Sequence, residues 1–206
     1  MIKHPKDIEY FNMYPTPIME RLQDMHFTNI NATIAHLGPM LYFLLRAQGA
    51  EKVLEIGHAE GYTSRYLAHA VKDNGTRFGM KDNHYWGVDI AQTEKTRSNL
   101  EAEGLPVTVI NMDSINITPD TFKGITFDTI FQDGAHDADH VIHEFNVLWP
   151  QVKSGGTGYW IAHDVLPGAP AHEGFLYIKA LIDSGRINAE YVQLWDVYGM
   201  AIIRKI

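Results

Sequence analysis

Hydrophobic residues recur along the chain with two different spacings, which alternate from about residue 50 onward. Short and nearly continuous apolar runs predict strands, and longer stretches with apolar residues three and four positions apart predict helices. The predicted strands are 52–57, 84–90, 106–111, 127–133 and 155–164, and the predicted helices are 62–73, 92–104, 138–152 and 173–185. Such alternation is typical of a parallel sheet that helices cover on both faces.

The two ends of the chain depart from this alternation. Helical spacing at 16–25 and 33–48 predicts N-terminal helices, and two strands are expected around the turn DVYG at 196–199. We therefore predict an α/β fold, with a doubly wound, mostly parallel seven-stranded sheet and a C-terminal antiparallel hairpin. The predicted organisation is a single domain over 1–206, with a helical cap over 1–48 and the core over 49–206.

One stretch carries no clear periodicity. Residues 74–84, NGTRFGMKDNH, are mostly polar and contain two glycines. We expect an extended loop there, in front of the second strand.

Composition narrows the classes of function. The chain has 206 residues, a net charge of -8 and no cysteine, which rules out disulfides and thiolate chemistry. No cluster of Lys and Arg stands out, so we expect no nucleic-acid partner. No apolar run reaches the roughly 20 residues that span a bilayer, and the N-terminus lacks the apolar core of a signal peptide. We expect a cytoplasmic protein that acts on a small molecule and does not bind membranes.

The first predicted strand ends in an acidic, glycine-containing turn. In VLEIGHAEGYTS (53–64), Glu55 is followed by Gly57 and Gly61, and a helical pattern begins at once. The spacing matches neither the dinucleotide-binding motif nor the P-loop. Because an acid there would repel a pyrophosphate, the turn suits a cationic or amine-bearing ligand. The alternative is that the glycines only shape a tight turn.

This turn resembles the first motif of class I S-adenosylmethionine (SAM) methyltransferases. In that family the glycine turn wraps the methionine part of SAM, and a nearby acid serves its charged end. The resemblance implies a Rossmann-like methyltransferase fold with SAM as the cofactor. It places five residues of the turn at the cofactor: Glu55, Gly57, Gly61, Thr63 and Ser64.

Acidic residues also follow the next two strands. The carboxylate of Asp89 can accept hydrogen bonds from two ribose hydroxyls, and the resemblance makes it the ribose-binding acid. The alternative is a cap for the following helix. Met112 and Asp113 follow the third strand, where the family contacts the adenine ring and its amino group. Aspartate is also common in turns without any ligand.

Asp133 and Asp164 follow the fourth and fifth strands, and we expect them to meet beside the SAM pocket. Two neighbouring carboxylates favour a cation such as Mg or Mn between them. These segments resemble the divalent-metal-dependent O-methyltransferases of the catechol, caffeoyl-CoA and macrolide-sugar kinds. The resemblance implies Asp133, His163 and Asp164 as metal ligands and Asp133 also as a cofactor neighbour. Because His163 replaces an acid of that pattern, the sequence leaves the metal dependence open.

His136 lies three residues after Asp133. Catechol-type enzymes have a lysine at that offset as general base, so the resemblance implies His136 as the base and Asp133 as its catalytic neighbour. An imidazole can accept a proton at neutral pH; the alternative is a cap for the next helix. We expect His58 and His172 at the surface or at the rim of the site. We expect His140 and His143 to be structural.

The leading hypothesis is a SAM-dependent methyltransferase that transfers a methyl group to a hydroxyl of a small molecule, with or without a metal. Methylation of nitrogen remains open. A SAM-binding accessory protein without turnover is a second hypothesis. A third is a metal-dependent α/β hydrolase that uses Asp133, His136, His163 and Asp164. The aromatic stretch YFNMYP at 10–15 also suggests a homodimer, in which it would cover the neighbouring subunit's site.

Overall fold

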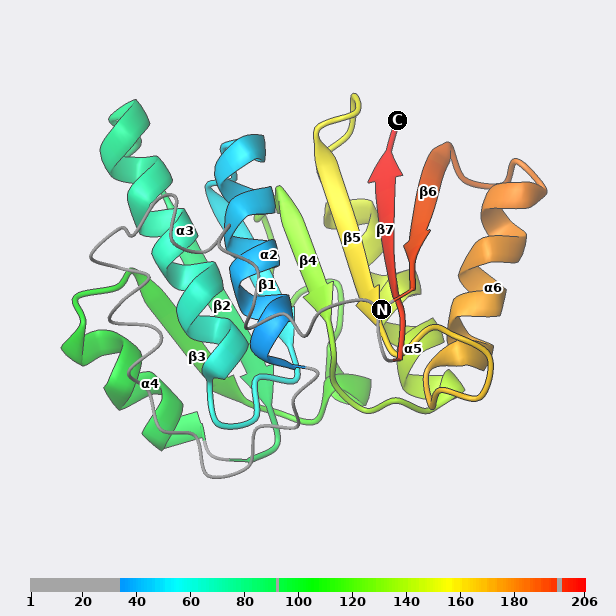
Figure 1. The fold of residues 1–206 in the computed structure, drawn as a ribbon, viewed down its shortest axis with the longest axis horizontal. Coiled ribbons are helices and arrows are strands. Elements are labelled where there is room, and N and C mark those ends of the chain that lie inside the picture. Colours follow the sequence, from blue (N-terminus) through cyan, green and yellow to red (C-terminus); the bar gives the residue numbers. More distant parts are fainter. Residues whose placement is uncertain (1–33, 92, 196–197) are drawn as a thin grey trace, which may run out of the picture. The chain divides into compact units, whose positions relative to one another are not determined.

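The computed structural model describes residues 34–91, 93–195 and 198–206. Its centre is a seven-stranded sheet with the order β3-β2-β1-β4-β5-β7-β6 (Figure 1). The strands are β1 Lys52–Ile56, β2 His84–Asp89, β3 Val107–Asn111, β4 Thr129–Gln132, β5 Gly158–His163, β6 Ala189–Leu194 and β7 Met200–Lys205. The helix predicted at 16–25 and the stretch 10–15 lie outside the described residues.

The pairing of the strands confirms the predicted fold class. β1 to β5 pair in parallel, whereas β7 runs antiparallel to both β5 and β6. The chain moves outward from β1 to β3 and then returns to β4 on the other side of β1. This reversal between β1 and β4 is the switch point at which open α/β sheets bind ligands, beyond the carboxyl ends of the strands.

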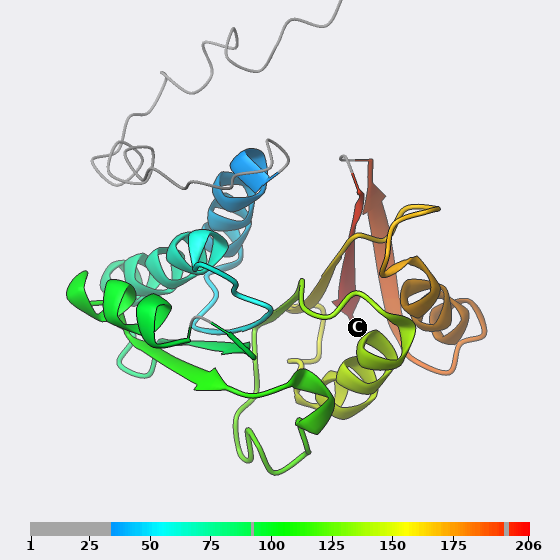
Figure 2. The same cartoon turned by 90° about the horizontal axis from the view of Figure 1, so that it is seen from below.

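Helices cover both faces of the sheet, as Figures 1 and 2 show. One face carries α2, α3 and α4, and the other carries α5 and α6. Their bounds are α2 Ile34–Gln48, α3 Tyr62–Phe78, α4 Thr93–Ala102, α5 Ala138–Leu148 and α6 His172–Asp183, with short 3-10 helices η3 Ser114–Asn116 and η4 Trp149–Gln151. No helix of the described ranges has the length and apolarity needed to cross a membrane.

The strands in the middle of the sheet are buried on both faces. Every residue of β4 is buried, and so is every residue of β5 except Tyr159. Phe145 of α5 stacks on Trp149 and meets Trp160 of β5 edge to face. This double burial explains the nearly continuous apolar runs in the sequence.

The prediction of an extended loop over 74–84 is wrong, because α3 continues to Phe78. The amide of Asn74 donates to the carbonyls of Leu45 and Ala50 at 2.9 and 2.8 Å, at the end of α2. A Cβ on Gly75 would lie 2.5 Å from the side chain of Asn83, so the small residue permits close packing. These tertiary contacts outweigh the poor helix propensity of Asn and Gly. The helix ends at Phe78 and is capped by Gly79, which has the left-handed conformation.

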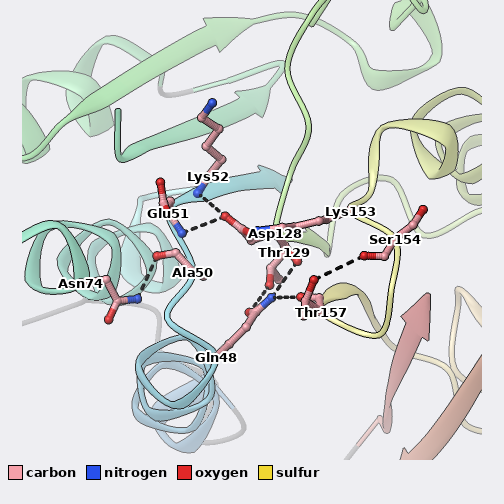
Figure 3. Close-up of polar contacts among 10 residues, drawn as sticks. All are labelled: Gln48, Ala50, Glu51, Lys52, Asn74, Asp128, Thr129, Lys153, Ser154 and Thr157. Atoms are coloured by element: carbon pink, nitrogen blue, oxygen red, sulfur yellow. Dashed lines mark hydrogen bonds and ion pairs between the residues drawn. The ribbon is translucent and has the colours of Figure 1, made fainter. Parts of the chain in front are cut away.

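The C-terminal end of α2 is bonded to the edge of the sheet opposite the carboxyl ends of the parallel strands (Figure 3). The Gln48 amide nitrogen donates to the carbonyls of Asp128 and Thr157 at 2.9 and 2.7 Å. Its oxygen accepts a hydrogen bond from the Thr129 hydroxyl at 2.7 Å. One side chain thereby joins α2 to the beginnings of β4 and β5.

Candidate functional site

A cavity of about 510 Å³ lies at the carboxyl ends of β1, β2, β3 and β4. Its volume is in the range of small-molecule and cofactor sites. Its lining comes from the ends of four strands and from the beginning of α5. The lining residues are Ile56, Gly57, Ala59, Val88, Asp89, Ile90, Met112, Asp113, Ser114, Asp133, Gly134, Ala135, His136 and His140.

The glycine turn after β1 is built for close packing. Gly57 has φ +84°, and a Cβ there would lie 2.2 Å from the carbonyl oxygen of Asp133. Gly61 has φ +82°, and a Cβ there would lie 2.7 Å from the methyl group of Thr96. Both positions therefore require glycine for conformation and for space. The turn lies directly against the segment after β4, and Gly57 itself lines the cavity.

Glu55 lies behind the cavity wall. Its side chain is fully buried and accepts hydrogen bonds from Ser64, at 2.5 Å, and from the Tyr85 hydroxyl. Burial raises the pKa of Glu55 to about 8, although these two donors act in the opposite direction. Thr63 and Ser64 are buried as well. The lining of this cavity does not include Glu55, Gly61, Thr63 or Ser64, so their direct contact with the cofactor stays a prediction.

Asp89 joins the glycine turn to the end of β2. One carboxylate oxygen accepts from the Ala59 amide at 2.8 Å, and the other accepts from the Ala91 amide at 2.8 Å. A carboxylate has about four lone-pair positions, so Asp89 can accept further hydrogen bonds from a ligand in the cavity. Within the described residues, Asp89 accepts hydrogen bonds from these two loop amides. Neither amide belongs to α4, which begins at Thr93.

Met112 and Asp113 line the cavity after β3. Asp113 caps the 3-10 helix η3, because its Oδ1 accepts from the Ile115 amide at 3.3 Å. The same oxygen accepts from His140 Nε2 at 3.1 Å. Asp113 thus stabilises the turn after β3 and also lines the cavity, so the two alternatives for this residue do not exclude each other.

The carboxylates of Asp133 and Asp164 both lie beside His163, as their predicted positions at the ends of neighbouring strands led us to expect. His163 Nδ1 lies 3.2 Å from an oxygen of Asp133 and 3.2 Å from an oxygen of Asp164. Burial lowers the pKa of His163, but its contacts with the two carboxylates outweigh burial and raise it to about 10. Asp164 has φ +60°, a left-handed conformation that costs energy for a residue other than glycine. Such strain is common at functional sites.

His136 belongs to the same cluster. Its Nδ1 lies 3.3 Å from Asp164 Oδ2, and its side chain is 35% exposed. The N-cap of α5 is Asp137, so the alternative in which His136 caps that helix is wrong. Asp133, His136 and Asp164 each offer a ligand atom, and these atoms all lie within 4.8 Å of one another. This set differs from the predicted metal ligands, because His136 takes the place of His163.

The sequence did not indicate every residue of the site. Ile90, 68% exposed, and Ser114 line the cavity although neither was singled out. His140, which was expected to be structural, lines it too. The expectation that His58 lies at the surface or rim is also wrong, because this residue is buried, with 2% of its surface exposed. An isoleucine directly after Asp89 was the available signal for Ile90, and for His140 the signal was its position in the first turn of the helix that follows Asp133 and His136.

The residues at the cavity fit both groups that the resemblance implies, SAM and a divalent metal. Asp89 and Asp113 offer acceptors at separate places on the cavity wall, as the hydroxyl and amino donors of an adenosine require. Two carboxylates and an imidazole are a donor set for a divalent metal, with more nitrogen character than Mg prefers.

Comparison with known proteins agrees with this geometry. A family model described as "Methyltransferase domain" matches residues 54–165, more than half of the chain. Caffeoyl-CoA O-methyltransferase 1 of Eucalyptus globulus is 26% identical over an alignment that covers 100% of this chain and 88% of the relative. Caffeoyl-CoA O-methyltransferase 2 of Populus trichocarpa is 29% identical, with 91% and 80% covered.

Solved structures share the fold. The O-methyltransferase TomG from Streptomyces achromogenes, solved with SAM, superposes with a TM-score of 0.71 at 18% identity, covering 100% of this chain and 99% of that one. An O-methyltransferase from Bacillus cereus, solved with SAH, gives 0.68 at 20% identity, with 98% and 96% covered. The family match, the cavity at the switch point and the shared fold confirm the resemblance, and the chain belongs to the methyltransferase-domain family of SAM-dependent enzymes.

Proposed function

We propose that the enzyme transfers the methyl group of SAM to a hydroxyl of a small molecule that binds beside Asp133, His136 and Asp164. The observation that carries the proposal is that ligand atoms of these three side chains lie within 4.8 Å of one another, and that two of the three, Asp133 and His136, line the cavity. A hydroxyl is a poor nucleophile until its proton is removed or its pKa is lowered, and these groups can serve that need. The relatives named O-methyltransferases support oxygen rather than nitrogen as the acceptor.

The cofactor would lie between the glycine turn and the segment after β4. SAM supplies an electrophilic methyl group on a sulfonium. Asp89 would accept hydrogen bonds from the ribose hydroxyls, and Asp113 would accept one from the adenine amino group. Asp133 and His136, beyond β4, line the same cavity, and His136 contacts Asp164 beyond β5, so the acceptor can be aligned for transfer beside them.

His136 is placed to accept the proton of the acceptor. Its Nδ1 faces Asp164 Oδ2 at 3.3 Å, an arrangement that favours a proton on Nδ1 and leaves Nε2 as the acceptor. The partial exposure of the ring allows the proton to reach solvent afterwards.

The same three groups can instead bind a divalent metal. A bound metal would act as a Lewis acid that lowers the pKa of the acceptor hydroxyl. In that arrangement His136 is a ligand rather than the base. His163, whose ring nitrogen lies 3.2 Å from both carboxylates, would hold them in place.

Calorimetry of SAH and of Mn, with and without chelator, separates these roles. Asp89→Asn should weaken SAH binding about tenfold or more, because it loses the charge that accepts the ribose hydroxyls. Asp164→Asn should leave SAH binding unchanged, since asparagine tolerates φ +60°, but should abolish methyl transfer to a panel of hydroxylated acceptors.

The results of chelation assign His136. Transfer that is lost with chelator and restored by Mn, together with weaker Mn binding in His136→Ala, makes it a ligand, whereas transfer that survives chelator but not His136→Ala makes it the base. SAH binding without turnover on any acceptor would favour the accessory-protein hypothesis. Metal binding without SAH binding would contradict the proposal and favour the hydrolase.

A further inference from the structure

A chain of charged side chains lies at one end of the cavity, and the proposed transfer step does not use it. Asp113, after β3, and His140, on α5, both line the cavity. His140 Nε2 donates to Asp113 Oδ1 at 3.1 Å, and His140 Nδ1 lies 2.7 Å from Asp137 Oδ2. Both ring nitrogens therefore face carboxylates.

These contacts leave one oxygen of Asp113 available. Oδ1 accepts from both His140 and the Ile115 amide, whereas no contact to Oδ2 is present within the described ranges. Because two donors bind the same oxygen, they restrict the rotation of a carboxylate whose side chain is 47% exposed. Without such contacts an exposed aspartate would sample several rotamers.

Asp137 holds His140 in turn. As the N-cap of α5, it accepts from the His140 amide at 3.0 Å through Oδ1 and faces the imidazole with Oδ2. An imidazole with a carboxylate at each nitrogen is favoured in its protonated form. Accordingly, Asp137 raises the pKa of His140, burial opposes this effect, and Asp113 raises the pKa further.

We propose that His140 is a positioning residue for the cofactor: with Asp137 it holds Asp113 so that the free oxygen accepts a hydrogen bond from the amino group of adenine. This inference rests on the proposed placement of SAM in the cavity. It makes the selectivity for a 6-amino purine over a 6-oxo purine a joint property of Asp113 and His140.

S-adenosylhomocysteine and S-inosylhomocysteine are suitable probes, because they differ only at C6 and N1 of the purine: the 6-amino group becomes an oxo group and N1 gains a proton. By calorimetry, the wild type should bind the adenosyl compound about tenfold more tightly, since a 6-oxo group brings an acceptor against the carboxylate. His140→Ala should lose most of this preference. His140→Gln should keep part of it, because its amide nitrogen can still donate to Asp113.

His143→Ala is the matched control. His143 lies on the same helix and donates through Nε2 to the Ile117 carbonyl at 2.8 Å, but it does not line the cavity. The control should retain the wild-type preference. The double variant Asp113→Ala/His140→Ala should bind no more weakly than Asp113→Ala, because His140 acts through Asp113.

Three results overturn the inference: an unchanged preference in His140→Ala, equal weakening of both ligands in that variant, or additive losses in the double variant. A wild type that binds neither ligand would overturn the proposed cofactor site itself. If the wild type binds both ligands and His140→Ala leaves the preference between them unchanged, this inference alone is overturned.

Discussion

Glu144 lies one turn beyond His140 on α5, and its side chain is fully buried. Burial raises its pKa from an ordinary 4.5 to about 8, although Ser114 and His140 act in the opposite direction. The folded protein therefore keeps a proton that the unfolded chain releases. The stability that comes from the neutral acid is fully present below pH 4.5 and is lost as the pH rises through about 8.

Glu144→Gln removes this ionisation. The free energy of unfolding of the variant, relative to the wild type, should rise by about 2 kcal/mol or more between pH 5 and pH 8. Urea unfolding at several pH values measures this difference. Glu173→Gln, at an exposed position of α6, is the control. Its free energy of unfolding should depend on pH in the same way as that of the wild type. Parallel curves for Glu144→Gln would contradict the assignment.

At the scale of elements, Asp128 joins the end of α2 to the beginnings of β1 and β4 (Figure 3). Its buried carboxylate accepts from the Glu51 and Lys52 amides, each at 2.9 Å, and from Lys153 Nζ at 3.0 Å. Its carbonyl accepts from Gln48, at the end of α2. The network lies at the opposite edge of the sheet from the cavity, so it stabilises the fold without contacting the site.

Asp128→Ala should lower the free energy of unfolding by about 3 kcal/mol, because it leaves backbone donors and a lysine without their acceptor. Asp120→Ala removes an exposed ion pair with Lys123, in which both side chains are 80% exposed, and should change the free energy by about 0.5 kcal/mol or less. Urea unfolding compares the two. SAH affinity should stay at the wild-type value in both variants, and a loss in Asp128→Ala would show that the two edges are coupled.

At the scale of the whole molecule, the cavity joins the two halves of the sheet. Gly57 and Asp89 come from the half that contains β1 to β3, whereas Asp133 and His136 follow β4, beyond the point where the strand order reverses. A ligand that contacts both sides binds the folded state alone and stabilises it by mass action.

SAH at 100 times its dissociation constant should stabilise the protein by about 2.7 kcal/mol and raise the melting temperature by roughly 5 to 10 °C. Thermal scanning with increasing SAH measures this shift. Asp89→Asn should show a smaller shift at the same SAH concentration. A wild-type melting temperature that does not depend on SAH would contradict the placement of the cofactor.

The sequence predicted much of the fold and many of the site positions. The apolar runs indicated the strands because a sheet buried on both faces leaves few polar positions, and the acids at the strand ends followed from that register. It failed at Asn74 and Gly75, which are poor helix formers that α3 retains through contacts with α2 and with Asn83. Local propensity cannot report partners that are distant in the sequence.

The sequence by itself determined the α/β class, the glycine turn, and the acids Asp89, Asp113, Asp133 and Asp164 at the ends of their strands. Only the tertiary structure decided how side chains group there: His136 faces Asp164, His163 lies between two carboxylates, and Glu55 is buried behind the wall. The reason is physical. Strand periodicity fixes which edge of the sheet a residue occupies, but the direction and packing of its side chain depend on neighbours that the fold brings together.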